Sequence, residues 1–259
     1  MPVYFGPQQY GPETSLQRFF LRSLIKLFVT DLGVRNRKCL DMLGLNESHL
    51  YFDEVYSSTN LYPCVNHRTS KKGFILINIR GQELMEGRAP KAYQGFRELL
   101  ELIQKSLKLP YRLFMMSGGS FSDDKAFVDY LGSEKVESLK VTALPKTLDA
   151  KELIDIASNA YGVISMSFHG CILSMIGGAP AIPMESDEYY SYKYADFDRY
   201  TGFQNVPIVA LKDFDVEKSA GLICKYFDSY DQEITFKQRA KAYVRISAWY
   251  EHIVGDVVD

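Results

Sequence analysis

The sequence is poor in cysteine and has no long apolar run. Four cysteines (Cys39, Cys64, Cys171 and Cys224) are spread over 259 residues, without a CxxC pair. This spacing argues against a zinc site or a disulfide framework and indicates buried thiols in a reducing compartment. No window approaches the roughly 20 apolar residues of a membrane-spanning helix. The first residues, MPVY, lack the features of a signal peptide. We therefore expect a cytoplasmic protein without a transmembrane segment.

The chain also lacks a large excess of charge of either sign. The chain has 30 basic and 32 acidic residues, which gives a formal net charge of −2. Such a balance provides no global attraction to nucleic acid or to an anionic membrane, so we expect no nucleic-acid partner. It leaves open a peripheral association with the inner face of the membrane. We find no internal repeat and no low-complexity tract.

Apolar runs alternate with helical patterns from Gly73 onward. We expect strands at residues 73–80, 111–117, 140–144, 163–165 and 181–183, and helices at 92–107, 123–131, 150–160, 215–230 and 236–253. Continuous apolar strands are typical of a parallel sheet that is buried on both faces. The alternation therefore predicts an α/β fold, with one parallel, doubly wound sheet between Gly73 and about Leu211.

The first 69 residues predict a smaller α/β region. A strand at 2–7 ends in a Gly-Pro turn and is followed by a helix at 15–29, a strand at 30–35 and a short helix at 36–44. Residues 60–72 are polar, lack periodicity and form the best linker candidate. We expect a partial N-terminal lobe at 1–69, a second lobe at 70–235, and a closing helix at 236–259 that packs back on the first lobe. Its apolar stripe should bury Trp249.

The strongest candidate site is the turn Ser167-Phe168-His169-Gly170. It follows a short apolar strand, and ligands of open α/β sheets bind beyond the carboxyl ends of strands. His169 can give or take a proton near neutral pH, and Gly170 allows the backbone to approach a ligand closely. A helix start also favours an anion. A histidine that merely hydrogen-bonds its own turn is the alternative.

Other polar residues end the predicted strands. Ser117 and Gly118 begin a glycine-containing turn whose backbone amides could bind phosphate or carboxylate, but the turn lacks the P-loop lysine and the dinucleotide fingerprint. A plain turn explains it equally well. Arg35 and Arg80 each close a strand. Guanidinium groups bind carboxylates and phosphates in bidentate fashion, although a salt bridge is the simpler role.

The segment from Tyr161 to Phe197 resembles a known family. It reads as a strand, the Ser-Phe-His-Gly turn, a small-residue helix, a Gly-Gly-Ala-Pro turn, a strand, and an acidic and aromatic loop that carries Lys193. This order is similar to the C-terminal half of the polysaccharide pyruvyl transferases. Residues 6–12 resemble the family's GQSIGP turn, which lies in the middle of its N-terminal domain. The resemblance implies two Rossmann-like lobes of glycosyltransferase-B type, with the N-terminal lobe incomplete.

The resemblance also implies a reaction. The donor would be phosphoenolpyruvate, and the acceptor a hexose of a polysaccharide or of its lipid-linked oligosaccharide precursor, as in exopolysaccharide or capsule biosynthesis. The product would be a pyruvate ketal, without a cofactor or metal. The implied catalytic residue is His169. The implied donor-binding lysine is Lys193. From their places at strand ends and turns we expect Arg80, Ser167, Gly170, Ser117 and Gly118 as further donor contacts, and Arg35, Gln9, Glu185 and Asp187 as candidate acceptor or anion contacts.

Two other classes of function stay open. The first is a transferase of the same fold that uses a nucleotide-sugar donor. An acidic residue placed to bind the ribose hydroxyls of the nucleotide would favour this alternative. The second is an inactive paralogue that acts as a binding protein.

Overall fold

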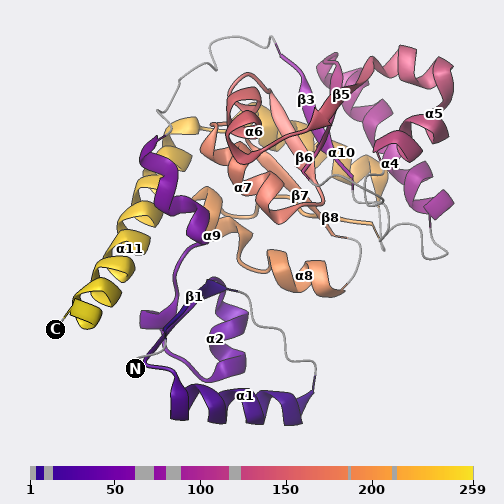
Figure 1. Ribbon diagram of the computed structural model, residues 1–259. Helices are drawn as coiled ribbons and strands as arrows, with labels where there is room; N and C mark the ends of the chain where they lie inside the picture. Colours follow the sequence, from indigo (N-terminus) through magenta and orange to yellow (C-terminus); the bar gives the residue numbers. More distant parts are fainter. Residues whose placement is uncertain are drawn as a thin grey trace. The chain divides into compact units, whose positions relative to one another are not determined.

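The chain folds into two compact units in a computed structural model that describes residues 4–8, 14–61, 73–79, 89–116, 124–185, 188–211 and 215–258 (Figure 1). Unit 1 comprises residues 1–63, 195–202 and 237–259. Unit 2 comprises residues 64–194 and 203–236. Each unit has its own secondary structure and buried core.

Unit 2 is built on a six-stranded sheet. Its strands are β3 (Ile75–Asn78), β4 (Tyr111–Met115), β5 (Val141–Thr147), β6 (Gly162–Ser165), β7 (Ala181–Glu185) and β8 (Val209–Ala210). The spatial order is β5-β4-β3-β6-β7-β8, and every neighbouring pair is parallel. All residues of β3 and β6 are buried, which explains their continuous apolar runs. The predicted parallel, doubly wound sheet is confirmed.

The helices of unit 2 pack in two groups. They are α4 (Ala89–Leu107), α5 (Asp124–Leu139), α6 (Ala150–Ala157), α7 (Phe168–Ile176) and α10 (Val216–Ser229). Helix α4 packs against α10 and α5, and α6 packs against α7. Helix α5 is longer than the predicted 123–131, because a second helical segment continues beyond Gly132 (φ 71°). Asp149 and Glu152 form a capping box that starts α6 at the expected residue.

The residues around Lys193 form a helix, α8 (Glu188–Tyr194), so the prediction of a loop was wrong. Tyr190 and Tyr194 lie one helical turn apart, and both are buried. Their rings stack with centroids 6.1 Å apart. Burial of this aromatic pair stabilises the helix although tyrosine has only moderate helix propensity.

Unit 1 begins with a strand–helix–strand arrangement. Strand β1 (Tyr4–Gln8) pairs in parallel with β2 (Asp31–Val34), and α1 (Ser15–Phe28) connects them. Helix α2 (Arg37–Leu43) follows, capped by Asn36 and ended by Gly44 in the left-handed region (φ 68°). The short 3-10 helices η1 (Glu47–His49) and η2 (Glu54–Leu61) complete this part. The four predicted elements between residues 4 and 44 are thus present.

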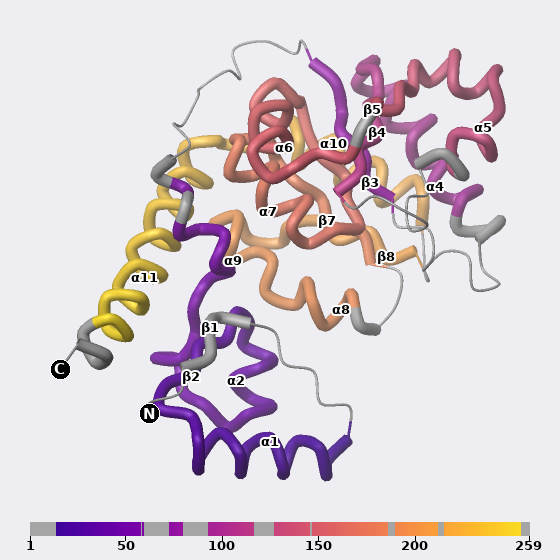
Figure 2. The backbone as a smooth tube through the Cα atoms, viewed as in Figure 1, coloured from indigo at the N-terminus to yellow at the C-terminus, as the bar shows by residue number. Residues whose placement is uncertain are grey.

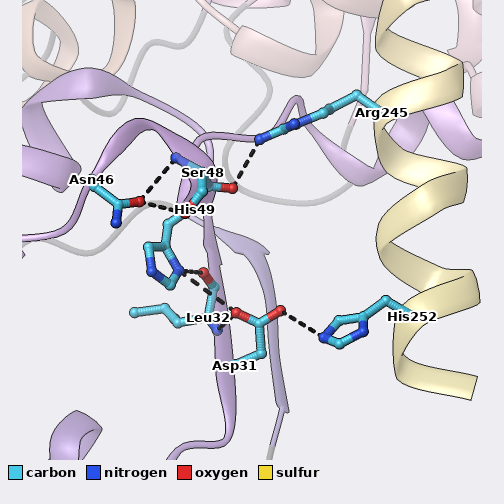
Figure 3. Close-up of polar contacts among 7 residues, drawn as sticks. All are labelled: Asp31, Leu32, Asn46, Ser48, His49, Arg245 and His252. Atoms are coloured by element: carbon cyan, nitrogen blue, oxygen red, sulfur yellow. Dashed lines mark hydrogen bonds and ion pairs between the residues drawn. The ribbon is translucent and has the colours of Figure 1, made fainter. Parts of the chain in front are cut away.

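Two later segments complete unit 1, namely α9 (Phe197–Thr201) and the part of α11 (Gln232–Val258) from residue 237 onward. Figure 2 shows α11 running along the segment that holds η1 and η2. Trp249 is 4% exposed, and its ring lies 5.9 Å from that of Tyr51. Arg245 donates a hydrogen bond to the Ser48 carbonyl at 2.8 Å (Figure 3). Helix α11 starts four residues earlier than expected, directly after α10.

Three cysteines, Cys39, Cys171 and Cys224, are buried thiols, as expected. The fourth, Cys64, lies outside the described residues. Within the described ranges, no helix is long and apolar enough to cross a membrane.

Candidate functional site

The sheet of unit 2 has a topological switch point between β3 and β6. From β3 the chain moves outward through β4 to β5, and from β6 it moves outward in the opposite direction. Connections that diverge in this way leave a crevice beyond the carboxyl ends of the two strands, where ligands of such folds bind. Asn78 ends β3 and Ser165 ends β6 at this point.

Asn78 and Ser165 form a buried polar link across the switch point. The Ser165 hydroxyl donates to Asn78 Oδ1 at 3.2 Å. Asn78 Nδ2 in turn donates to the Phe114 carbonyl of β4 at 2.9 Å. Because both side chains are buried, losing one partner would leave the other unsatisfied. The link therefore holds the ends of three neighbouring strands in a defined arrangement.

The same serine shapes the turn that enters α7. Ser165 Oγ accepts from the Ser167 amide at 3.0 Å. The Ser167 side chain caps α7 by accepting from the Gly170 amide at 3.2 Å. A Cβ atom at position 170 would lie 2.6 Å from Ser165 Oγ. Gly170 is therefore required by its packing against Ser165, whether or not a ligand approaches it.

His169 lies in the first turn of α7 and is exposed, whereas its neighbour Phe168 is buried. The two rings meet edge to face with centroids 6.0 Å apart. The N-terminal end of a helix carries partial positive charge and attracts anions. The structure thus places an accessible imidazole at the carboxyl edge of the sheet, beside a helix end suited to an anion.

Lys193 comes to the same place from α8. Its Nζ lies 5.8 Å from the centroid of the Phe168 ring and 5.6 Å from that of Tyr190, within the about 6 Å range of cation–π interactions. The Tyr194 hydroxyl donates to the Met166 carbonyl at 2.9 Å and anchors α8 to the turn between β6 and α7. Lys193 and His169 therefore both flank Phe168, although 24 positions separate them in the chain.

Cys171 is the buried thiol of this region, and it is unsuited to act as a nucleophile. Burial raises its pKa well above the ordinary range, while a hydrogen bond with Ser165 and the charge of Lys193 oppose the shift. A thiol that stays protonated is a poor nucleophile. We therefore assign Cys171 to the core.

Glu185 ends β7 at the same edge of the sheet and is partly exposed. Its backbone carbonyl accepts from the Leu211 amide at 2.9 Å. Five other predicted site residues lie outside the described residues: Gln9, Arg80, Ser117, Gly118 and Asp187.

Arg35 belongs to unit 1, at the end of β2. Its Nη1 lies 2.6 Å from Asp53 Oδ2, and its side chain is only 13% exposed. The Tyr200 hydroxyl donates to the Arg35 carbonyl at 2.9 Å. The geometry therefore gives Arg35 a salt bridge, the simpler of the two roles that the sequence allowed.

Sequence reasoning overlooked Asn78 and Ser165. A signal was present, since each is a polar residue that ends an otherwise apolar run (ILIN and VIS). The hydrogen bond between them could not be predicted from the sequence, because it depends on β3 and β6 being neighbours in the sheet.

The family model for polysaccharide pyruvyl transferase matches residues 12–188, which is more than half of the chain. The chain belongs to this family. The match includes the switch point and His169 and ends before Lys193. The resemblance read from the sequence is confirmed.

Solved structures show the same fold at low sequence identity. A protein from Listeria monocytogenes assigned as a UDP-N-acetylglucosamine 2-epimerase has a TM-score of 0.59 and 13% identity, covering 97% of this chain and 66% of its own. The UDP-GlcNAc 2-epimerase of Methanocaldococcus jannaschii has a TM-score of 0.55 and 12% identity, covering 95% and 69%. The calicheamicin glycosyltransferase CalG4 has a TM-score of 0.50 and 12% identity, covering 96% and 60%.

These likenesses support a glycosyltransferase-B-type fold, as predicted. This chain spans about two thirds of the length of the first of these proteins. A comparison with curated proteins found no significant match.

Proposed function

We propose that the protein transfers a pyruvyl group from phosphoenolpyruvate to a hexose of a polysaccharide or of its lipid-linked precursor. Family membership supports this class of reaction. The observation that carries the proposal is the arrangement around Phe168, where an exposed imidazole, a helix N-terminus and a lysine gather at the switch point. Phosphoenolpyruvate is a compact anion with a carboxylate and a phosphate, which suits such a site.

The reaction balances without an added oxidant or reductant. The donor's methylene carbon gains one proton and becomes a methyl group. Two hydroxyl oxygens of the sugar form bonds to the central carbon, and the bond from that carbon to the phosphate oxygen breaks. Of the two protons that the hydroxyls release, one balances the methyl group and the other leaves with phosphate. The chemistry therefore needs a group that moves protons and groups that stabilise anionic charge.

We assign proton transfer to His169 and charge stabilisation to Lys193 and the N-terminal end of α7. His169 is exposed, so it can reach a bound substrate. Lys193 is held over two aromatic rings, which limits its conformational freedom. Gly170 and Ser167 shape the turn, and Arg80, Ser117 and Gly118 stay candidate donor contacts on the basis of their places after predicted strands alone.

The assay is phosphate release from phosphoenolpyruvate with a panel of glycan acceptors, combined with donor titration by calorimetry. We expect His169→Ala to lower turnover by about 10²–10⁴-fold while donor binding is largely kept. Lys193→Ala should mainly weaken donor binding, because it removes charge pairing in the ground state as well. Matched controls are His252→Ala, which removes an exposed histidine of unit 1, and Lys218→Ala, which removes an exposed lysine of α10.

Failure of the wild-type protein to bind phosphoenolpyruvate at millimolar concentration would overturn the donor assignment. Binding of a UDP-sugar instead would favour a nucleotide-sugar transferase. Donor binding without turnover, with every acceptor tested, would favour a binding protein.

A further inference from the structure

Ser165 is a fully buried serine that ends β6, directly before the turn that carries His169. Its hydroxyl oxygen accepts from the Ser167 amide at 3.0 Å. Its carbonyl accepts from the Cys171 thiol at 3.7 Å. Gly170 packs so closely against Ser165 Oγ that a Cβ atom at position 170 would lie 2.6 Å from it. Ser165 therefore contacts residues on both sides of His169.

The Ser165 hydroxyl has one proton and two acceptors at the same distance. Asn78 Oδ1 and the Ser167 carbonyl each lie 3.2 Å from Ser165 Oγ, and a hydroxyl donates one hydrogen. The Ser167 carbonyl already accepts from an amide of α7 at 3.0 Å. Asn78 is held by two bonds of its own, because its Nδ2 donates to the Phe114 carbonyl at 2.9 Å and its carbonyl accepts from the Met166 amide at 3.1 Å. Asn78 thus offers the Ser165 proton an acceptor of fixed orientation.

We propose that Ser165, oriented by Asn78, is a positioning residue that sets the place of the His169 imidazole. This role rests on the proposed function, in which His169 transfers protons. The bond to the Ser167 amide and the contact with Gly170 fix the backbone on both sides of His169. His169 itself is exposed, so its position depends strongly on the backbone that carries it. Misplacing a reacting group by about 1 Å can cost roughly 10²-fold in rate.

The first test is a double-mutant cycle that combines Ser165→Ala with His169→Ala and measures phosphate release from phosphoenolpyruvate. Ser165→Ala should lower kcat by about 10–100-fold. The donor's dissociation constant should change by less than about threefold, because Lys193 comes from α8 and is kept. In the His169→Ala background, Ser165→Ala should cost less than about twofold, because Ser165 acts only through the imidazole. A merely structural role would lower turnover by a similar factor in both backgrounds.

Ser174→Ala is the matched control. Ser174 is also a fully buried serine, and its hydroxyl donates to the Gly170 carbonyl within α7 at 2.6 Å. A serine that bonds the carbonyl four residues earlier adds little to the stability of a helix. This variant should therefore keep kcat within about twofold of the wild type. A loss that is confined to Ser165→Ala would then not come from the removal of a buried hydroxyl as such.

A second measurement does not need turnover, and it separates this inference from the proposed function. The NMR signal of the His169 Cε1–H group is assigned by its disappearance in His169→Ala. In Ser165→Ala this signal should shift or broaden, while the signals of His49 and His252 in unit 1 stay in place. Ser174→Ala should leave all three unchanged. A shifted His169 signal in a protein that releases no phosphate would overturn the transfer reaction and still support the positioning of His169.

Asn78→Ala tests the other end of the link. Without Asn78 Oδ1, the Ser165 hydroxyl keeps the Ser167 carbonyl as its acceptor. The His169 signal should therefore move in the same direction as in Ser165→Ala, but by a smaller amount.

Two results would overturn the inference. One is a His169 signal that is the same in Ser165→Ala and in the wild type. The other is a loss of turnover in Ser165→Ala that persists at the same size in the His169→Ala background. If circular dichroism shows that Ser165→Ala does not fold, Ser165→Cys replaces it in both measurements, because a thiol has a similar size and is only a weak donor and acceptor.

Discussion

Unit 2 is built from six parallel strands along a nearly continuous stretch of chain, whereas unit 1 is assembled from three separate segments. In unit 2 the central strands β3 and β6 are wholly buried, and helices pack on them in two groups. Its stability therefore comes mainly from apolar surface removed from water.

Unit 1 depends more on arginines that bind the backbone of distant segments. Arg199 of α9 donates to the carbonyls of Arg35 and Tyr51 and lies 4.2 Å above the Phe52 ring. Burial lowers its pKa. Arg239 of α11 donates to the Thr59 carbonyl. A two-stranded sheet buries little surface by itself, so these long-range bonds have a larger share in holding the described part of unit 1 together.

Removing α11 gives the largest expected effect. A chain that ends after Ile234 loses Trp249, Arg239 and Arg245, which contact the segment between residues 48 and 59. We expect insoluble or unfolded protein, measured by expression solubility and circular dichroism. A chain that ends after Val254 keeps these contacts and is the control. A soluble truncation at Ile234 with a cooperative melt would contradict the dependence of unit 1 on α11.

Substitutions in the two cores should distinguish the stability of unit 1 from that of unit 2. Phe227 in unit 2 and Phe52 in unit 1 are both buried aromatics, and replacing either with alanine should cost about 3–5 kcal/mol. Trp249 is the single tryptophan and belongs to unit 1, so its fluorescence reports that unit. Phe52→Ala should lower the urea concentration at the midpoint of the Trp249 fluorescence transition. Phe227→Ala should mainly lower the urea concentration at which the amides of β3 and β6 lose their protection from hydrogen exchange. Equal shifts in both probes would mean that the units unfold as one.

Arg199→Met tests the arginine bonds of unit 1. It removes the donor to the Tyr51 carbonyl, whereas the Arg35 carbonyl keeps its bond from the Tyr200 hydroxyl. The stranded acceptor should cost about 1–3 kcal/mol of unfolding free energy. Arg37→Met is the control, because Arg37 is 56% exposed and pairs with the exposed Glu47 at 3.2 Å. That change should stay within about 0.5 kcal/mol. Similar losses in urea denaturation for both variants would refute the special role of Arg199.

High pH should weaken both units. Burial raises the pKa of Tyr111 and Cys171 in unit 2 and of Tyr200 in unit 1. As pH rises above the ordinary pKa values, about 8.5 for thiols and 10 for phenols, the unfolded chain releases protons that the folded chain retains. Stability then falls by up to about 1.4 kcal/mol per pH unit for each group. Denaturation at pH 7 and pH 10.5 measures the loss, and Tyr200→Phe should reduce it. A stability that rises with pH would contradict this sign.

The smallest effect is expected at Asp31 (Figure 3). His49 Nδ1 lies 3.6 Å from Asp31 Oδ1 and also 2.9 Å from the Leu32 carbonyl, while His252 Nε2 lies 3.8 Å from Asp31 Oδ2. Both contacts with Asp31 are longer than 3.5 Å and the His252 side chain is 54% exposed, so Asp31→Asn should cost under about 1 kcal/mol. Thermal melts of the variant and the wild type measure this. A loss equal to that of Arg199→Met would place these ion pairs among the main supports of unit 1.

The central strands of unit 2 could be predicted because β3 and β6 are buried on both faces. Apolar runs such as ILIN and GVIS are then expected, and the capping box at Asp149 marks a helix start without tertiary information. Helix α8 was missed because its signal is a buried tyrosine pair. A tyrosine-rich segment reads as a loop until the surface that covers Tyr190 and Tyr194 is known.

The candidate site could likewise be predicted from the sequence only in part. The position of His169 beyond a strand followed from the sequence, since βα turns of parallel sheets lie at one edge. The hydrogen bond between Asn78 and Ser165 did not, because 87 positions separate the two residues and only the strand order brings β3 beside β6.

The sequence by itself determined the α/β class, the family and the approximate places of five of the strands of unit 2, because local burial patterns and turn residues encode them directly. Only the tertiary structure decided which strands are neighbours, that Lys193 meets Phe168 from a helix, and that Arg35 pairs with Asp53. It also decided that large apolar side chains of α1, such as Phe20 and Leu24, lie open to solvent. These features depend on contacts between residues far apart in the chain, and an amphipathic pattern does not specify what its apolar face will meet.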